Sequence, residues 1–236
     1  MKLLIIFSSM EEAKYFIEWL ITGKEIPSEL QSLGIMAPYQ LFSYEIEGIN
    51  IDVVIAGETN FETSFHTTSI LRQKRYHLAL QIGTATSNDD KIAIGDLVNV
   101  INDKPLDISI IENNSKSNAY DCNLLNLESY PHQMGGFVNK TNAYFNVFLD
   151  VKKVAGASMN ELYLNDIKKQ NELKSNAQVH IHCLNGIGFS YSCLYLKQSF
   201  YQLRIIINNR TDNKVDKTYA LQKASTELIE IIKKIS

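Results

Sequence analysis

Short apolar segments alternate with segments of helical periodicity along most of this 236-residue chain. Residues 2–9 form an Ile-rich apolar run that ends in small polar residues, which is typical of a buried strand. Residues 11–21 carry Ala13, Phe16 and Ile17 at helical spacing, so they predict a helix directly after that strand. Such alternation predicts an α/β fold with a central mixed, mostly parallel sheet that helices cover on both faces.

The same periodicities predict the remaining elements and leave one long segment without a regular pattern. Further strands are predicted at residues 40–47, 49–56, 77–83, 97–101, 152–157, 177–182 and 203–207. Further helices are predicted at residues 63–73, 159–173, 188–196 and 218–235. Residues 103–134 are polar and aperiodic, which predicts a long loop of the kind that is usually functional or mobile. No repeat or linker interrupts the chain, so residues 1–236 are predicted to form a single domain.

The composition excludes several classes of partner. The net charge of −3 at pH 7 gives no attraction to nucleic acid or to an acidic membrane surface. No segment approaches the roughly 20 apolar residues of a membrane-spanning helix, and Glu11 and Glu12 follow the apolar start too closely for a signal peptide. Three cysteines without CxxC spacing fit a reducing compartment, so the expected location is the cytoplasm. His180 and His182 lack an evident third ligand, so no metal site is expected.

Polar residues follow two of the predicted strands, at the edge where an α/β sheet binds its ligands. Ser9 ends the first predicted strand and Glu12 follows it, and a carboxylate there can act as a general base toward water. Equally, Glu12 in the first turn of a helix would complement the helix dipole. Gly83, Thr84 and Ala85 end another strand, where backbone N–H groups and a hydroxyl can contact an anion or a ribose. The same residues can make a plain tight turn, so both segments keep two interpretations.

The segment at residues 180–209 carries further polar residues at strand ends. Leu184 and Asn185 follow one short strand, and Asn208 follows the β-branched strand at residues 203–207. An amide side chain offers both a donor and an acceptor, which suits the edge of a base or a ribose hydroxyl. Asn also caps turns, so the alternative is a structural role for both amides.

Taken in order, these segments resemble the nucleoside phosphorylase and nucleosidase superfamily, most closely the futalosine hydrolases, relatives of the methylthioadenosine/adenosylhomocysteine nucleosidases. The start MKLLIIFSSMEEA is similar to the family's first strand and water-activating Glu, a role that falls on Glu12. The segment LALQIGTATSNDDKIAIGDLVNV looks like the family's glycine turn and IGD segment. The segment CLNGIGFSYSCLYLKQSFYQLRIIINN is similar to the SMEGAAFAY helix start and the RAIS strand end, where Asn208 would bond the purine near N7. The resemblance assigns catalysis to Glu12 and Asn208, and substrate binding to Ser9, Gly83, Thr84, Ala85, Leu184 and Asn185.

The chain departs from the family pattern at the ribose site. Asn185 stands where the family has the Glu of a Met-Glu pair, and Leu184 stands in place of the Met. The change removes a charge-assisted hydrogen bond, a class of interaction worth about 1.5–3 kcal/mol. Each loss of about 1.4 kcal/mol in the transition state slows turnover about tenfold. A neutral amide also stabilises an oxocarbenium-like sugar less than a carboxylate does.

Two functions therefore remain open. In the first, the chain is an N-ribosyl hydrolase of a purine nucleoside such as futalosine, with Glu12 activating water, Asn208 holding the base and Asn185 gripping the ribose. In the second, it is a catalytically inactive paralogue that binds a nucleoside or acts as an interaction module. No metal or organic cofactor is implied, and no basic residue lies in the turns that would hold a phosphorylase's phosphate. The resemblance also implies a homodimer or a higher homo-oligomer.

Overall fold

The computed structural model describes residues 1–21, 40–46, 48–105, 109–112, 115–118, 126, 129–133, 135–141, 144–159, 179–209 and 216–235. The helix predicted at residues 159–173 lies outside these ranges except for Met159. Cys122 also lies outside them, and the other two cysteines, Cys183 and Cys193, are buried free thiols.

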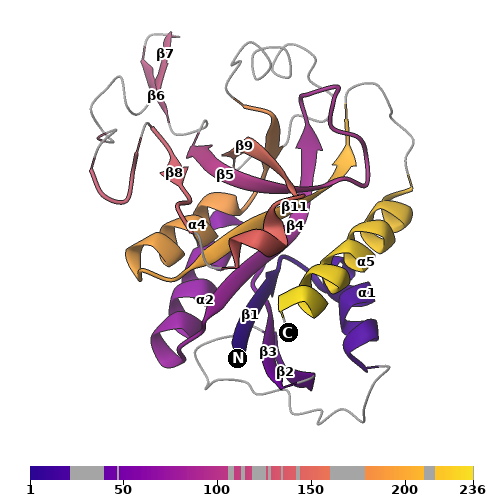
Figure 1. Ribbon diagram of the computed structural model, residues 1–236. Coiled ribbons are helices and arrows are strands. Elements are labelled where there is room, and N and C mark those ends of the chain that lie inside the picture. The colour runs from indigo at the N-terminus through magenta and orange to yellow at the C-terminus, as the bar shows by residue number, and fades with distance from the viewer. Residues whose placement is uncertain are drawn as a thin grey trace.

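The described residues form strands and helices that alternate along the chain (Figure 1). The strands are β1 (Lys2–Phe7), β2 (Gln40–Ile46), β3 (Ile49–Ile55), β4 (Leu78–Ser87), β5 (Leu97–Pro105), β6 (Ser109–Glu112), β7 (Ser115–Asn118), β8 (Phe137–Val138), β9 (Lys152–Ser158), β10 (Ile181–Cys183) and β11 (Phe200–Asn208). The helices are α1 (Met10–Ile21), α2 (Asn60–Gln73), α4 (Gly186–Tyr195) and α5 (Lys217–Ile235), with a 3-10 turn, η1, at Phe145–Phe148. None of the described helices is long and apolar enough to cross a membrane.

One nine-stranded mixed sheet organises the molecule, and β6 and β7 form a separate pair. Five pairings in the large sheet are parallel (β1–β3, β1–β4, β4–β11, β5–β9 and β9–β10) and four are antiparallel (β2–β3, β4–β10, β5–β8 and β5–β11). Because β10 pairs with both β9 and β4, the strands β4, β11, β5, β9 and β10 close into a ring. The strands β1, β3 and β2 continue from β4 as an open sheet.

Alternate residues of β1 belong to two separate hydrophobic cores. Leu3, Ile5 and Phe7 join a core that includes buried residues of α1 and α5. Leu4 and Ile6 join a second core with buried residues of α2 and α4. This follows from the two-residue period of a strand, which sends neighbouring side chains to opposite faces of the sheet. The apolar run from Leu3 to Phe7 thus supplies side chains to both cores, as a strand that is buried on both faces requires.

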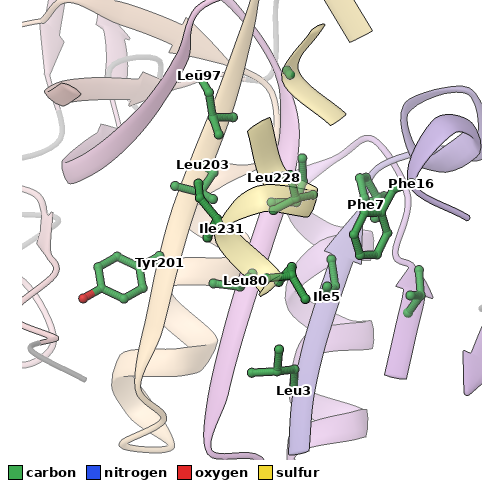
Figure 2. Packing of buried hydrophobic residues seen from close by; sticks show 14 of the residues in the cluster. Leu3, Ile5, Phe7, Phe16, Leu80, Leu97, Tyr201, Leu203, Leu228 and Ile231 are labelled. Atoms are coloured by element: carbon green, nitrogen blue, oxygen red, sulfur yellow. The ribbon is translucent and has the colours of Figure 1, made fainter. Parts of the chain in front are cut away.

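The largest core lies between the sheet and the α1–α5 pair (Figure 2). Leu228 and Ile231 of α5 lie over Leu203 of β11, and the rings of Phe7 and Phe16 are 5.8 Å apart. The predicted apolar face of the last helix is confirmed, since its members are all buried: Leu221, Ala224, Leu228, Ile231 and Ile232. Burial of apolar area at about 25 cal/mol per Å² makes this face the main attachment of α5.

Several element boundaries differ from the sequence prediction. The helix predicted to start at residue 63 begins at Asn60, because Thr59 and Glu62 form a capping box before it. The strands β4 and β5 continue four residues beyond their predicted ends at 83 and 101. The prediction of one long loop at residues 103–134 is wrong where β5 continues and where β6 and β7 pair.

Candidate functional site

A cavity of about 200 Å³ lies where the carboxyl ends of several strands meet the starts of helices. The strands β1, β3, β4 and β11 run parallel through their pairings, so their carboxyl ends lie at one edge of the sheet. The strand β10 runs antiparallel along the end of β4, with His182 opposite Thr86, and this brings the residues after β10 to the same edge. The lining residues are Ser8, Ser9, Glu12, Glu58, Thr84, Ala85, Thr86, His182, Cys183, Leu184, Asn185, Ile207 and Lys217.

Glu12 is buried in the first turn of α1, and backbone N–H groups from two segments hold its carboxylate. Its Oε2 accepts a hydrogen bond from the N–H of Ser8 at 3.2 Å, and its Oε1 accepts one from the N–H of Thr84 at 2.9 Å. Both donors and the N-terminus of α1 stabilise negative charge at this place. Glu12 therefore occupies the first helical turn and also lines the cavity. Glu11, one residue earlier, is exposed and pairs with Lys217 at 2.7 Å.

Asn185 is buried directly before α4, and protein partners already satisfy its amide. Its Nδ2 donates to Oγ of Ser8 at 2.8 Å and to the carbonyl oxygen of Gly57 at 3.3 Å. Its Oδ1 accepts from Nε2 of Gln81 at 3.3 Å. Both N–H groups of the amide are thus in use, and only one lone pair of the oxygen is left for a ligand.

The structure brings most of the other predicted site residues to the same cavity. Ser9, Thr84, Ala85 and Leu184 line it together with Glu12 and Asn185. Asn208 does not line it. This residue ends β11 beside Ile207, opposite Thr86, and both of these neighbours are wall residues.

Gly83 also lies behind the wall, and its missing side chain has a packing reason. A Cβ atom on Gly83 would overlap Nη1 of Arg204 and press on Oγ of Ser8. The glycine thus allows β4 to accommodate the guanidinium of Arg204, which is wholly buried on β11. Arg204 does not reach the cavity, and its Nη2 donates to Oε1 of Gln81 at 2.8 Å.

A second buried charge lies near this arginine. Asp103 accepts hydrogen bonds on Oδ2 from Oγ of Ser158 and Nε2 of Gln202, each at 2.8 Å. Burial raises the pKa of Asp103 above its ordinary value, although these two bonds and the charge of Arg204 oppose the shift. Oδ1 of Asp103, and Nε and Nη1 of Arg204, have no hydrogen-bond partner among the described residues. The charge of Arg204 therefore acts on Asp103 without a direct hydrogen bond, in the low-dielectric interior where charge interactions are strong.

His182 lines the cavity as a neutral imidazole. It is 3% exposed, and burial lowers its pKa from 6.5 to about 4. Its Nδ1 has no partner within the described part of the chain, whereas Nδ1 of His180 accepts from the backbone N–H of Ala155 at 3.0 Å. In that same part of the chain, no group of three His, Cys, Asp or Glu side chains could hold a metal ion.

Comparison with known proteins identifies this architecture. No protein-family model and no curated protein matches the chain. A mutant of Helicobacter pylori futalosine hydrolase matches with a TM-score of 0.76 and 16% identity over 99% of each chain. The 5′-methylthioadenosine/S-adenosylhomocysteine nucleosidase of Campylobacter jejuni matches with a TM-score of 0.78 and 13% identity over 99% of each chain. The chain has the nucleosidase fold.

A third solved structure also shares this nucleosidase fold. It is the 5′-methylthioadenosine/S-adenosylhomocysteine nucleosidase of Helicobacter pylori with butyl-thio-DADMe-Immucillin-A, and it has a TM-score of 0.76 and 15% identity. The match covers 99% of this chain and 98% of that chain. Identities this low establish a shared fold, and the resemblance that the sequence predicted is confirmed at that level.

Five polar wall residues were not predicted as site residues from the sequence: Ser8, Glu58, Thr86, His182 and Lys217. Ser8 was placed inside the first predicted strand, which in fact ends at Phe7. Glu58 lies two residues after the predicted strand at residues 49–56, and this position was the signal that could have found it. Lys217 begins α5 and reaches the wall from a distant part of the chain, so nothing local in the sequence points to it.

Proposed function

We propose that the chain is an N-ribosyl hydrolase that cleaves the glycosidic bond of a purine nucleoside such as futalosine. The observation that carries the proposal is the carboxylate of Glu12, which is buried in the cavity wall between two backbone N–H donors. These donors fix the carboxylate in position and leave it lone pairs that can face a water molecule. The likeness to structures of nucleosidases supports this chemistry over others that α/β folds carry.

In the proposed reaction, Glu12 takes a proton from water as the water oxygen forms a bond to C1′ of the sugar. The bond between C1′ and the base nitrogen breaks, and its electron pair leaves with the base, which then takes up a proton. Asn208 would hold the base from the rim of the cavity, where it adjoins Ile207 and Thr86. The reaction consumes one water and releases the free base and the ribose part.

Hydrolysis is proposed in preference to phosphorolysis because the cationic side chains at or near the wall already have protein partners. Lys217 is the one cationic side chain among the described lining residues, and it is paired with Glu11 at 2.7 Å. Arg204 is buried away from the cavity and bound to Gln81. A phosphate co-substrate would therefore lack a free cation at this part of the wall, whereas water needs none.

The test is release of free base from futalosine, methylthioadenosine, adenosylhomocysteine and inosine by the purified chain. We expect release from at least one of them, and a loss of about 10²–10⁴-fold in Glu12→Gln, the usual contribution of a general base. Glu11→Gln is the matched control, because it makes the same change one residue away on an exposed side chain. Equal rates in the two variants would remove Glu12 from the mechanism.

A second candidate function is nucleoside binding without cleavage. It is favoured by the amide of Asn185, whose N–H groups are already used by Ser8 and Gly57. The cavity volume of about 200 Å³ is also below the range of roughly 300–1,000 Å³ that is common for small-molecule sites. Thermal stabilisation by a nucleoside without release of base would favour this function, and no response to any of the four nucleosides would contradict both. Homo-oligomerisation and a cytoplasmic location stay predictions, the former open to sedimentation velocity.

A further inference from the structure

A chain of buried hydrogen bonds runs from Arg204 to the cavity wall and fixes the direction of every donor along it. Arg204 has no acceptor atom, so the atom of Gln81 that it contacts at 2.8 Å is the carbonyl oxygen Oε1. The Nε2 of Gln81 therefore points toward Asn185 and donates to its main-chain oxygen at 3.2 Å and to its Oδ1 at 3.3 Å. The orientation of the Gln81 amide is thus set by the charge of the arginine.

The amide of Asn185 is fixed from both of its ends. On one side Gln81 donates to it, so the facing atom is Oδ1. On the other side the carbonyl oxygen of Gly57, which can only accept, lies 3.3 Å from Nδ2. Both neighbours require the same orientation, and the alternative would place two oxygens or two N–H groups against each other. The Nδ2 of Asn185 therefore donates to Oγ of Ser8 at 2.8 Å.

This series of hydrogen bonds ends at Ser8, which is a residue of the cavity wall. Its Oγ is occupied as an acceptor, so its own O–H has to donate elsewhere. No acceptor for this O–H exists among the described residues, while the backbone N–H of Ser8 is bound to Oε2 of Glu12. The cavity thus receives one unused donor beside the carboxylate.

We propose that Ser8 binds the ligand by donating a hydrogen bond to an oxygen of its sugar, and that Gln81 and Asn185 are positioning residues for that hydroxyl. This inference rests on the proposed function, because it requires a nucleoside in the cavity. The family resemblance implies a Glu carboxylate that accepts a hydrogen bond from the ribose, whereas here Ser8 donates one to the sugar. Asn185 then has no direct contact with the sugar.

Calorimetric titration with futalosine and with methylthioadenosine tests the proposal, in a Glu12→Gln background that does not consume the ligand. We expect Ser8→Ala to raise Kd about tenfold, which equals about 1.4 kcal/mol. Ser8→Thr keeps the hydroxyl and is expected to stay within about threefold of the reference, as a hydrogen bond of ordinary strength requires. Ser225→Ala removes a buried hydroxyl from α5 and serves as the control, with Kd unchanged. Thermal melts verify that each variant is folded.

The direction in which Asn185→Asp changes Kd shows whether Asn185 positions Ser8 or contacts the ribose itself. An aspartate would accept the proton of Ser8 and withdraw it from the ligand, so we expect Kd to rise about as much as in Ser8→Ala, by about tenfold, with no further rise in the double variant. If Asn185 itself gripped the ribose hydroxyls, the carboxylate would tighten binding instead. Tighter binding by Asn185→Asp, or an unchanged Kd in Ser8→Ala, would overturn the proposal while leaving the hydrolase function intact. A reference chain that binds neither nucleoside would overturn the proposed function and this inference with it.

Discussion

His182 is a wall residue whose protonation state is set by burial. The residue is 3% exposed, and burial acts on its pKa without an opposing contribution from a neighbouring carboxylate. The neutral form is therefore favoured, and burial lowers the pKa to about 4. At neutral pH the wall then presents an uncharged ring beside the carboxylate of Glu12, so the local negative charge is not neutralised by an imidazolium.

This burial predicts how the stability of the chain depends on pH. The unfolded chain protonates His182 below about pH 6.5, whereas the folded chain does so only below about pH 4. The unfolded state binds more protons in that window, so the free energy of unfolding falls as the pH falls through it, by up to about 3 kcal/mol. We expect His182→Gln to show a weaker fall between pH 7 and pH 4 in urea denaturation.

Asp103 also makes the free energy of unfolding depend on pH, so its effect has to be separated from that of His182. Burial raises its pKa, so its contribution to stability has the opposite sign and decreases as the pH rises. Because Asp103 is present in both chains, its contribution cancels in the difference between them. Parallel pH dependences of the two chains would show that His182 is protonated in the folded state.

The sequence could locate part of the site because strand ends are visible in it. Glu12 and Asn185 follow apolar strands, and parallel strands bring such ends to one edge. What the sequence could not show is hydrogen-bond occupancy, which depends on partners far along the chain. Gln81 and Ser8 bind the amide of Asn185 from 104 and 177 residues away, so these protein partners compete with the role predicted for Asn185 at the ribose.

At the scale of elements, the backbones of α2 and α4 approach each other closely at Gly188. A Cβ atom on Gly188 of α4 would overlap the carbonyl oxygen of Asn60 and press on the backbone N of Ser64. Gly188 lies in the first turn of α4, and its N–H donates to Oδ1 of Asn60 at 3.0 Å. Glycine at this position therefore sets the distance between the two helices that form the second core.

We expect Gly188→Ala to destabilise the chain by roughly 1–3 kcal/mol, the usual cost of overpacking. Helix propensity alone predicts the opposite sign, because Ala is about 1 kcal/mol better than Gly within a helix. Urea denaturation decides between the two effects. Ser69→Ala on α2 is the control, as it gains helix propensity at a partly exposed site and is expected to unfold at the same or a slightly higher urea concentration. A stabilised Gly188→Ala would contradict the close approach.

Element boundaries were predictable only where one face of the element is apolar. The strand β1 and the helix α5 match their predictions within two residues because hydrophobic side chains mark their whole length. The ends of β4 and β5 carry Thr86, Ser87 and Asp103, which are typical of loops, although Ser87 and Asp103 are buried. The strand conformation of these ends comes from pairing with β10, β11 and β9, and such long-range partners leave no periodic trace in the sequence.

At the scale of the whole molecule, the starts of the four described helices gather around the cavity. Ser9, Asn185 and Lys217 are wall residues at the starts of α1, α4 and α5, and Glu58 is a wall residue just before the cap of α2. Each helix start carries partial positive charge from unpaired N–H groups. The fold thus surrounds Glu12 with positive ends of dipoles, even though the chain as a whole has a net charge of −3. A ligand in this cavity contacts elements from both ends of the chain.

Since the wall is assembled from distant segments, ligand binding and global unfolding are expected to be coupled. A nucleoside at about 100 times its Kd stabilises the folded state by about 2.7 kcal/mol, which raises Tm by roughly 5–10 °C for a chain of this size. We expect this shift in the unchanged chain and in Glu12→Gln alike, because Glu12 acts on water and not on affinity. Release of base is expected to be about 10²–10⁴-fold slower in Glu12→Gln. Differential scanning fluorimetry over a range of nucleoside concentrations measures the shift. A shift that vanishes in Glu12→Gln would mean that this carboxylate holds the ligand itself, and the assignment of Glu12 as the base would then fail even if the nucleoside is the correct substrate.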